Sequence, residues 1–158
     1  MLPLLITDRT QAQYDAWAEM RDRGIDNMTD IEREQFLIEH PGAYNARDLN
    51  RVGTALNYVR DRLTAAGYLG GNEFTAKTNW QIGQIPTAEQ FSYYLKAVET
   101  IRAAMSRYQT TPPTPEDTGS LDIEGANNIE KILIDVDELI TNMLAVRNYC
   151  GELCSGEI

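Results

Sequence analysis

The stretch GANNIEKILIDVDELITNMLAVRNY, residues 125–149, has the most regular pattern of apolar residues in the chain. Its apolar residues are spaced alternately three and four positions apart, which places them on one face of an α-helix. They are Ile129, Ile132, Val136, Leu139, Met143 and Val146. Leu133, Ile140 and Leu144 widen this face, so it fits against more than one partner helix. We therefore expect a long bundle helix from about residue 122 to residue 149.

Two earlier stretches repeat this spacing. The first lies between Asn45, a favourable N-cap, and Gly67, a favourable terminator; its apolar residues are Leu49, Val52, Leu56, Val59 and Leu63. The second begins with the capping box of Thr87 and Gln90; its apolar residues are Phe91, Tyr94, Val98, Ile101, Met105 and Tyr108. Gly53 lies inside the first helix, and we interpret it as a place where another backbone approaches closely.

A near-heptad spacing is expected both in an antiparallel bundle within one chain and in a parallel coiled coil between chains. Each stretch covers only about three heptads and has its own caps and connections. This favours the bundle within one chain, and self-association can be added to it.

Two shorter helices are predicted before the long ones. The first spans about residues 10–23 and ends at Gly24; the second begins with a capping box of Thr29 and Glu32 and ends before Pro41. Residues 68–86 contain Gly70-Gly71 and several residues that favour strands, which predicts an extended connection or a small hairpin.

These elements give an all-α fold, a bundle of three long helices preceded by two shorter ones. We divide the chain into residues 1–43, an N-terminal arm with short helices, and residues 44–158, the long-helix bundle. The bundle includes a stiff Pro-rich connection at 109–121 and a C-terminal tail at 149–158.

The charge of the chain excludes some classes of partner. The formal net charge is −10, and residues 116–158 contain ten acidic residues against Lys131 and Arg147. Binding to nucleic acid or to an anionic membrane needs clustered basic residues, so neither is expected. No apolar run approaches the ~20 residues that span a bilayer, and the start, MLPLLITD, is a poor signal peptide.

Few residues in the chain suggest chemistry. His40 is the single histidine, and its position at a helix end favours contact with the last carbonyl groups. Cys150 and Cys154 cannot complete a structural zinc site and lack the two-residue spacing of redox pairs. Asp135, Asp137 and Glu138 are interpreted as a solvated acidic face of the last helix. No phosphate loop or nucleophile motif is present, so we expect no enzyme, cofactor, metal site or small-molecule substrate.

Two other groups of polar and aromatic residues have simple interpretations. The arginines of the helix over residues 45–67 alternate with acidic residues, which indicates surface ion pairs; they are Arg47, Arg51, Arg60 and Arg62. Tyrosines and a tryptophan are too numerous for one narrow seam, and some can mark a contact surface. These are Trp80, Tyr93, Tyr94, Tyr108 and Tyr149.

The two ends of the chain are the candidate docking segments. The apolar start can pack on its own core or dock on a neighbouring chain, and the first alternative is favoured. Its candidate residues are Leu2, Leu4, Leu5 and Ile6, and those of the C-terminal segment are Tyr149, Leu153 and Ile158.

Several stretches of the sequence, which together cover nearly the whole chain, are similar to those of a known group of proteins. They are ITDRTQAQYDAWAEMRDRG at 6–24, GAYNARDLNRVGTALNYVRDRLTAAGY at 42–68, KTNW at 77–80, IPTAEQFSYYL at 85–95, GANNIEKILIDVDELI at 125–140 and SGEI at 155–158. They resemble small proteins encoded in the tail regions of phages and prophages of Gram-positive gut bacteria. In that family the tail has aromatic or small residues in place of Cys150 and Cys154, which implies a packing segment rather than thiol chemistry.

The resemblance implies a non-enzymatic structural component of the virion, associated with the tail, baseplate or fibre. Its partners are then other virion proteins, and self-association is compatible with this role. It is located in the virion and, during assembly, in the cytoplasm of the bacterial host. The alternative is a soluble cytoplasmic adaptor or regulator that binds one host or phage protein.

Overall fold

A computed structural model describes residues 1–71, 73–117 and 121–154, with the side chains of all but Glu39 and residues 148–154. The described residues form helices and connections, with no strand among them. The long helices are α3 (Ala46–Ala65), α4 (Ala88–Ala103) and α5 (Ile123–Cys154). The short ones are α1 (Gln11–Arg23), the 3₁₀ turn η1 (Ile25–Asn27), α2 (Asp30–Glu34) and the π-helical segment η2 (Gln35–Glu39).

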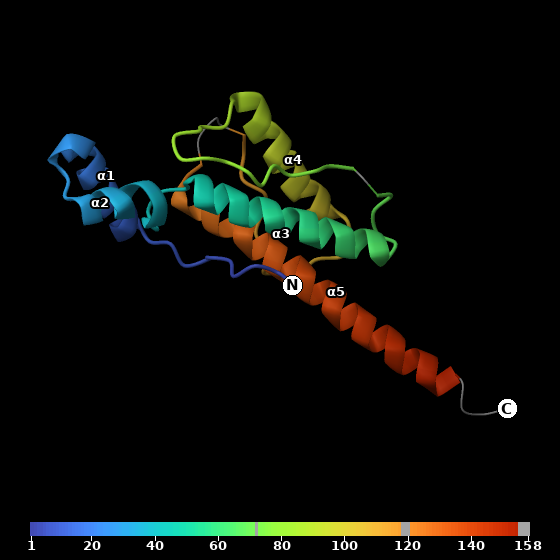
Figure 1. Cartoon of the computed structure of the whole chain (residues 1–158). Helices are drawn as coiled ribbons and strands as arrows, with labels where there is room; N and C mark the ends of the chain where they lie inside the picture. Colours follow the sequence, from blue (N-terminus) through green and yellow to red (C-terminus); the bar gives the residue numbers. More distant parts are fainter. Residues whose placement is uncertain (72, 118–120, 155–158) are drawn as a thin grey trace.

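The three long helices pack against one another within the chain, which confirms the predicted helical bundle (Figure 1). Their apolar faces meet in one core, because each helix presents residues three and four positions apart to the other two. The fully buried apolar residues of this core are Val52, Ala55, Leu56, Val59, Leu63, Val98, Ile101, Ile129, Ile132, Leu133, Val136 and Ile140.

Capping boxes fix where the predicted helices begin. Thr10, Thr29, Asn45 and Thr87 each accept a hydrogen bond from a backbone N–H three residues later. In each case the side chain of that later residue bonds back to the N-cap backbone. Both partners were readable in the sequence for Thr29 and Thr87, and the structure adds the boxes of Thr10 and Asn45.

Two helix ends differ from the prediction. α4 ends at Ala103, so Met105 and Tyr108 lie outside the helix to which we assigned them. There the chain turns back, and Arg102 Nε donates to the Pro112 carbonyl at 2.7 Å, which holds the Pro-rich connection beside α4. α5 runs to Cys154, five residues beyond the end expected at Tyr149. Residues 149–154, assigned to a tail, are therefore helical.

The connection between α3 and α4 lies on the surface of α3. Asn57 donates to the carbonyl of Ala76 and accepts from its N–H, both at 2.9 Å. Asn50 makes the same pair of bonds to Trp80, at 2.9 and 2.7 Å. Between the two asparagines a Cβ at Gly53 would lie 2.5 Å from the Lys77 carbonyl oxygen. The close approach predicted at Gly53 is confirmed, whereas the described residues of this connection form no hairpin.

The N-terminal helices form a small unit at one end of the bundle (Figure 1). α1 has no buried residue; its Trp17 stacks on Phe36 of η2, with ring centroids 5.7 Å apart. A Cβ at Gly42 would lie 2.1 Å from the Gln13 carbonyl oxygen, so the chain leaving η2 passes directly against α1. At the opposite end, α5 extends past α3 and α4 toward the C-terminus (Figure 1).

Candidate docking surfaces

The N-terminal arm, residues 1–10, lies along the bundle before α1 begins (Figure 1). Leu2 and Leu5 pack against the core. Two α5 side chains hold the backbone of the arm: Glu130 accepts from the Ile6 N–H at 2.6 Å, and Asn127 bonds to both the N–H and the carbonyl of Arg9. The arm is therefore bound to its own bundle by apolar packing and by backbone hydrogen bonds.

Beneath the arm, four charged side chains form a buried ion cluster. Arg9 bonds Asp48 at 3.0 Å and Glu130 at 2.6 Å, and Arg51 bonds the same two carboxylates at 2.6 and 2.8 Å. Glu130 is 0% exposed and Arg9 is 6% exposed. Two cations balance two anions, which compensates for the loss of hydration that makes buried charges costly. The cluster joins the arm, α3 and α5 at one point.

Two tyrosines continue this polar region toward α4. The hydroxyl groups of Tyr44 and Tyr94 are 2.6 Å apart and share a hydrogen bond, and the Arg9 guanidinium lies 5.4 Å from the centre of the Tyr44 ring. Burial raises the pKa of both hydroxyls, and the nearby charge of Glu130 raises it further. Both tyrosines therefore stay protonated in the folded protein well above neutral pH.

The four candidate docking residues at the N-terminus have different surroundings in the structure. Leu2 and Leu5 contact the chain's own core, whereas Leu4 is 88% exposed. Ile6 is half-buried and, with Leu4, lines a pocket of about 380 Å³ between the arm, η2 and the start of α3. The alternative in which the arm packs on its own bundle thus accounts for Leu2 and Leu5, and docking on a partner stays a prediction for Leu4.

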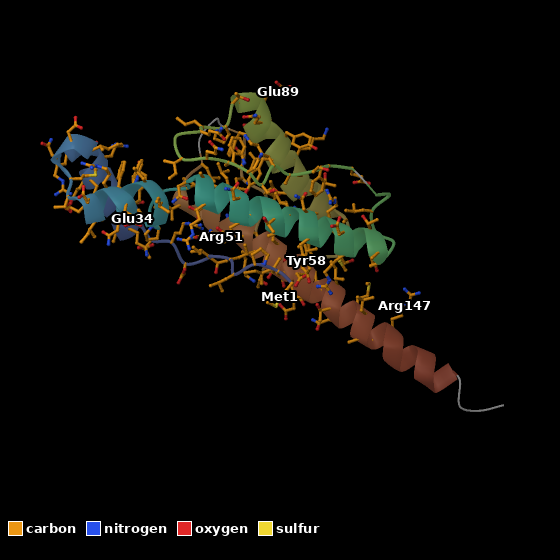
Figure 2. All side chains as sticks on the ribbon, viewed as in Figure 1. Met1, Glu34, Arg51, Tyr58, Glu89 and Arg147 are labelled. Atoms are coloured by element: carbon orange, nitrogen blue, oxygen red, sulfur yellow. The ribbon has the colours of Figure 1, made fainter. Side chains whose placement is uncertain are left out.

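The three C-terminal candidates lie at or beyond the limit of the structure. Tyr149 and Leu153 belong to α5 by their backbone, but their side chains are outside the described residues, and so is the whole of Ile158. On the same helix Val146 is 61% exposed. Arg147, the next residue, lies on the part of α5 that extends past the bundle (Figure 2).

Other exposed apolar side chains were missed by the sequence analysis, which looked for docking residues at the two ends. They include Ile25 at 42%, Ile31 at 71%, Ile82 at 57% and Ile85 at 85% exposure. Tyr93, which the sequence analysis had already named as a candidate contact residue, is 47% exposed. The common signal of the isoleucines is an apolar residue that falls outside the helical apolar faces, as Ile82 and Ile85 do in the connection before α4. Single exposed apolar residues are common in proteins, so this signal alone is weak.

Three polar assignments need correction. Arg51 is not a surface ion-pair residue, because its partners Asp48 and Glu130 are buried. Asp135 is 1% exposed rather than solvated, and it bonds Lys131 and the Thr111 hydroxyl. His40 does not cap carbonyl groups: its Nδ1 accepts the Gly42 N–H at 3.1 Å, and burial lowers its pKa.

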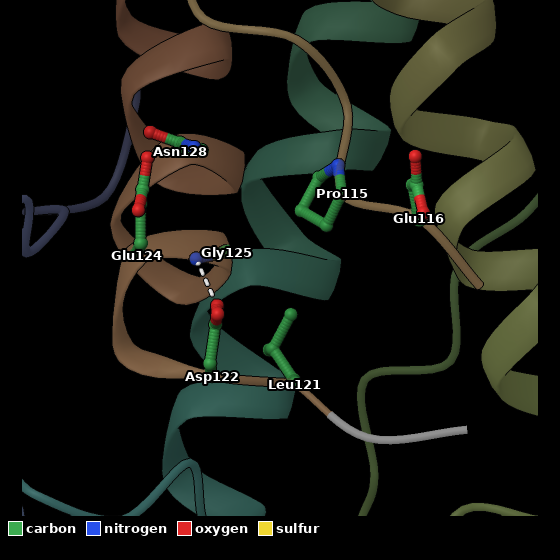
Figure 3. Close-up of a pocket in the computed structure, with 7 residues that line it drawn as sticks. All are labelled: Pro115, Glu116, Leu121, Asp122, Glu124, Gly125 and Asn128. Carbon is green, nitrogen blue, oxygen red and sulfur yellow. Dashed lines mark hydrogen bonds between the residues drawn. The ribbon is translucent and has the colours of Figure 1, made fainter. Parts of the chain in front are cut away.

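A second pocket lies at the start of α5 (Figure 3). Asp122 accepts the Gly125 N–H there at 2.6 Å, and Glu116 and Glu124 lie on its rim. These carboxylates are not placed for metal binding; in the part of the chain that the structure describes, no group of three or more His, Cys, Asp or Glu residues is so placed.

None of the described helices is long and apolar enough to cross a membrane.

Comparison with protein-family models gives no match, and comparisons with curated proteins and with solved structures give none either.

Proposed function

We propose that this chain is a non-enzymatic structural component of a phage particle, in the tail, baseplate or a fibre-associated part, that assembles with other virion proteins. The proposal rests on the resemblance of its sequence to phage tail-region proteins and on one observation of the structure. Apolar side chains are exposed at both ends of an elongated molecule, around a core that the chain completes by itself.

At one end, Ile31 of α2 is 71% exposed and Ile25 of η1 is 42% exposed. At the other end, Val146 of α5 is 61% exposed. Between them the ion cluster ties the arm, α3 and α5 together. A molecule with an apolar contact at each end is suited to link two neighbours, since burial of apolar surface drives most protein association.

The test is the composition of particles released by a bacterium that encodes this chain. After induction, particles are purified by density gradient, and each protein is counted by quantitative mass spectrometry. We expect the chain at a fixed copy number per particle, unchanged by a high-salt wash, while an abundant host enzyme is washed away. Recovery of the chain in the cytoplasmic fraction alone would contradict the proposal and favour the adaptor alternative.

A variant pair tests the exposed end of α2. Ile31→Ser replaces an exposed apolar side chain and Glu34→Ser an exposed charged one on the same helix, so neither change disturbs the core. We expect Ile31→Ser to lower the copy number in particles severalfold, and Glu34→Ser to leave it unchanged. Equal incorporation of the two variants would remove this end from the proposed contacts.

A further inference from the structure

We propose that the pocket between the N-terminal arm, η2 and the start of α3 binds a small organic carboxylate that carries a short apolar chain. The pocket has a volume of about 380 Å³, which is within the range of pockets that hold small molecules. The inference does not depend on the proposed assembly function, because it concerns a ligand of this chain and no contact within a particle. It rests on the hydrogen-bonding groups and the apolar side chains that line the pocket.

Apolar side chains form much of the pocket wall. Ile6 of the arm, Ile38 of η2 and Pro41 are partly buried there. Leu4 of the arm lines the pocket from a position that is 88% exposed. These side chains can remove the surface of an apolar chain from water, which favours binding. An inorganic anion such as phosphate has no apolar group with which to use this wall.

The side-chain acceptors that line the pocket already accept hydrogen bonds. Asn45 Oδ1 accepts from the backbone N–H groups of Arg47 and Asp48, and Asn45 Nδ2 donates to a carbonyl of η2. Asp48 accepts from the two arginines of the ion cluster and from the Asn45 N–H. A ligand that brings hydrogen-bond donors, such as an amine, therefore finds no acceptor without a partner among these side chains.

Two donors that line the pocket have no partner among the residues that the structure describes. The first is Arg51 Nη1; Nη2 of the same guanidinium bonds Asp48 and Glu130 at 2.6 and 2.8 Å, which fixes its orientation (Figure 2). The second is His40 Nε2. Because His40 Nδ1 accepts the Gly42 N–H, the proton of the neutral ring is on Nε2. Burial lowers the pKa of His40, which keeps the ring neutral near pH 7.

The charges of the pocket favour an anion as the acceptor for these two donors. The charged residues of the lining are Arg47, Asp48 and Arg51, which are two cations and one anion. Beneath them Arg9 compensates the charge of Glu130. Hydrogen bonds from arginine to a carboxylate are among the strong ones in proteins, because the charges assist them. A carboxylate with an apolar chain matches both the donors and the wall.

The test uses the single histidine of the chain, whose ring C–H signals in a proton–carbon NMR spectrum report on the pocket alone. Hexanoate, titrated into the full chain at pH 7, should shift these signals saturably, with a dissociation constant of about 1 mM or below. Hexanol lacks the charge and phosphate lacks the apolar chain, so each should bind at least tenfold more weakly at equal ionic strength. The absence of a saturable shift up to about 20 mM hexanoate would overturn the inference, and so would equal binding of either control.

A variant pair then assigns the binding to this pocket. Leu4→Asp places a negative charge in the lining and should raise the dissociation constant of hexanoate at least tenfold. Thr7→Asp is the matched control, because it places the same charge on an exposed position of the same arm, outside the lining. Both positions are exposed, so circular dichroism should show equal helical content. Unchanged binding by Leu4→Asp, or equal weakening in both variants, would overturn the assignment.

Discussion

Glu130 has an unusual position for a glutamate, since its side chain is completely buried on the central helix of a bundle. Its two carboxylate oxygens accept from Arg9, Arg51 and the Ile6 N–H. Removing one partner from a buried ion pair is costly, because the remaining charges stay out of water without compensation. Glu130 is therefore the residue of α5 at which the arm and α3 meet.

Glu130→Gln keeps the shape of the side chain and removes its charge, leaving Arg9 and Arg51 with Asp48 as their shared carboxylate in the cluster. We expect the free energy of unfolding to fall by about 3 kcal/mol. Urea denaturation followed by circular dichroism measures it. Glu138→Gln, the same change at an exposed position of the same helix, should alter it by less than about 0.5 kcal/mol. Similar losses in the two variants would show that the cluster does not stabilise the fold.

The tyrosine pair beside the cluster predicts a dependence of stability on alkaline pH. The pKa values of Tyr44 and Tyr94 are raised, mainly by burial, so above pH 10 the unfolded chain loses these protons and the folded chain keeps them. Their contribution is complete below the unfolded pKa, near 10, and is lost as pH rises above it, with a slope of up to about 1.4 kcal/mol per pH unit for each group.

Urea denaturation between pH 9 and pH 11 tests this dependence. The double variant Tyr44→Phe/Tyr94→Phe should have a flatter decline in unfolding free energy than the wild type. Tyr14→Phe, at an exposed position, should leave the slope unchanged. If the double variant declines as steeply as the wild type, the two hydroxyls are not the source of the effect.

The sequence contained only half of the information about this cluster. Glu130 directly follows Ile129, at the edge of an apolar face, so its burial could have been suspected. Arg9 gave no such signal, because it precedes the first helix and lies 121 positions from Glu130. Pairing across that separation depends on the path of the arm, and local patterns do not encode this path.

At the level of the elements, the connection between α3 and α4 is packed directly against the surface of α3. Gly53 permits the Lys77 carbonyl to lie against the helix, and Asn50 and Asn57 bond the connection on either side of it. Gly→Ala in an open helix stabilises by up to ~1 kcal/mol. At Gly53 the added Cβ would clash with the Lys77 carbonyl, so alanine is expected to destabilise the fold rather than stabilise it.

Gly53→Ala should lower the free energy of unfolding by about 1–3 kcal/mol, because the connection must move away from α3. Thr54→Ala is the control on the next, exposed position and should change it little. Denaturation midpoints of the two variants, with hydrogen exchange of the Ala76 and Trp80 amides, measure the effect. A stabilised Gly53→Ala variant would show that the connection does not lie on the helix in solution.

Helix starts were predictable because capping chemistry is local: Thr29 with Glu32, and Thr87 with Gln90, are complete within four residues. The end of α4 was not, because the apolar spacing continues through Met105 and Tyr108 after the helix has ended. Met105 still packs against the core from the turn that follows. The apolar side chain of Met105 correctly indicated burial, but its spacing from the preceding apolar residues wrongly predicted that it belongs to the helix.

For the whole molecule, the sequence predicted the class of fold and the three packed helices. It favoured packing of the N-terminal arm on its own core, as Leu2 and Leu5 do, but it did not predict that α5 extends beyond the bundle. It predicted the short helices but not how they are held: α1 buries no residue, and it is held by the Trp17–Phe36 stack and the close approach at Gly42. The N-terminal unit therefore has far less buried apolar surface than the bundle.

This contrast predicts that the two parts unfold separately. The chain has two tryptophans, Trp17 in the N-terminal unit and Trp80 on α3's connection, so Trp80→Phe leaves a fluorescent reporter of the unit and Trp17→Phe a reporter of the bundle. We expect the Trp17 signal to change at a urea concentration at least 1 M lower than the far-ultraviolet circular dichroism, because little apolar surface stabilises the unit. The Trp80 signal should change together with the circular dichroism. Coincident transitions for both reporters would mean that the arm and the ion cluster couple the unit to the bundle in a single cooperative fold.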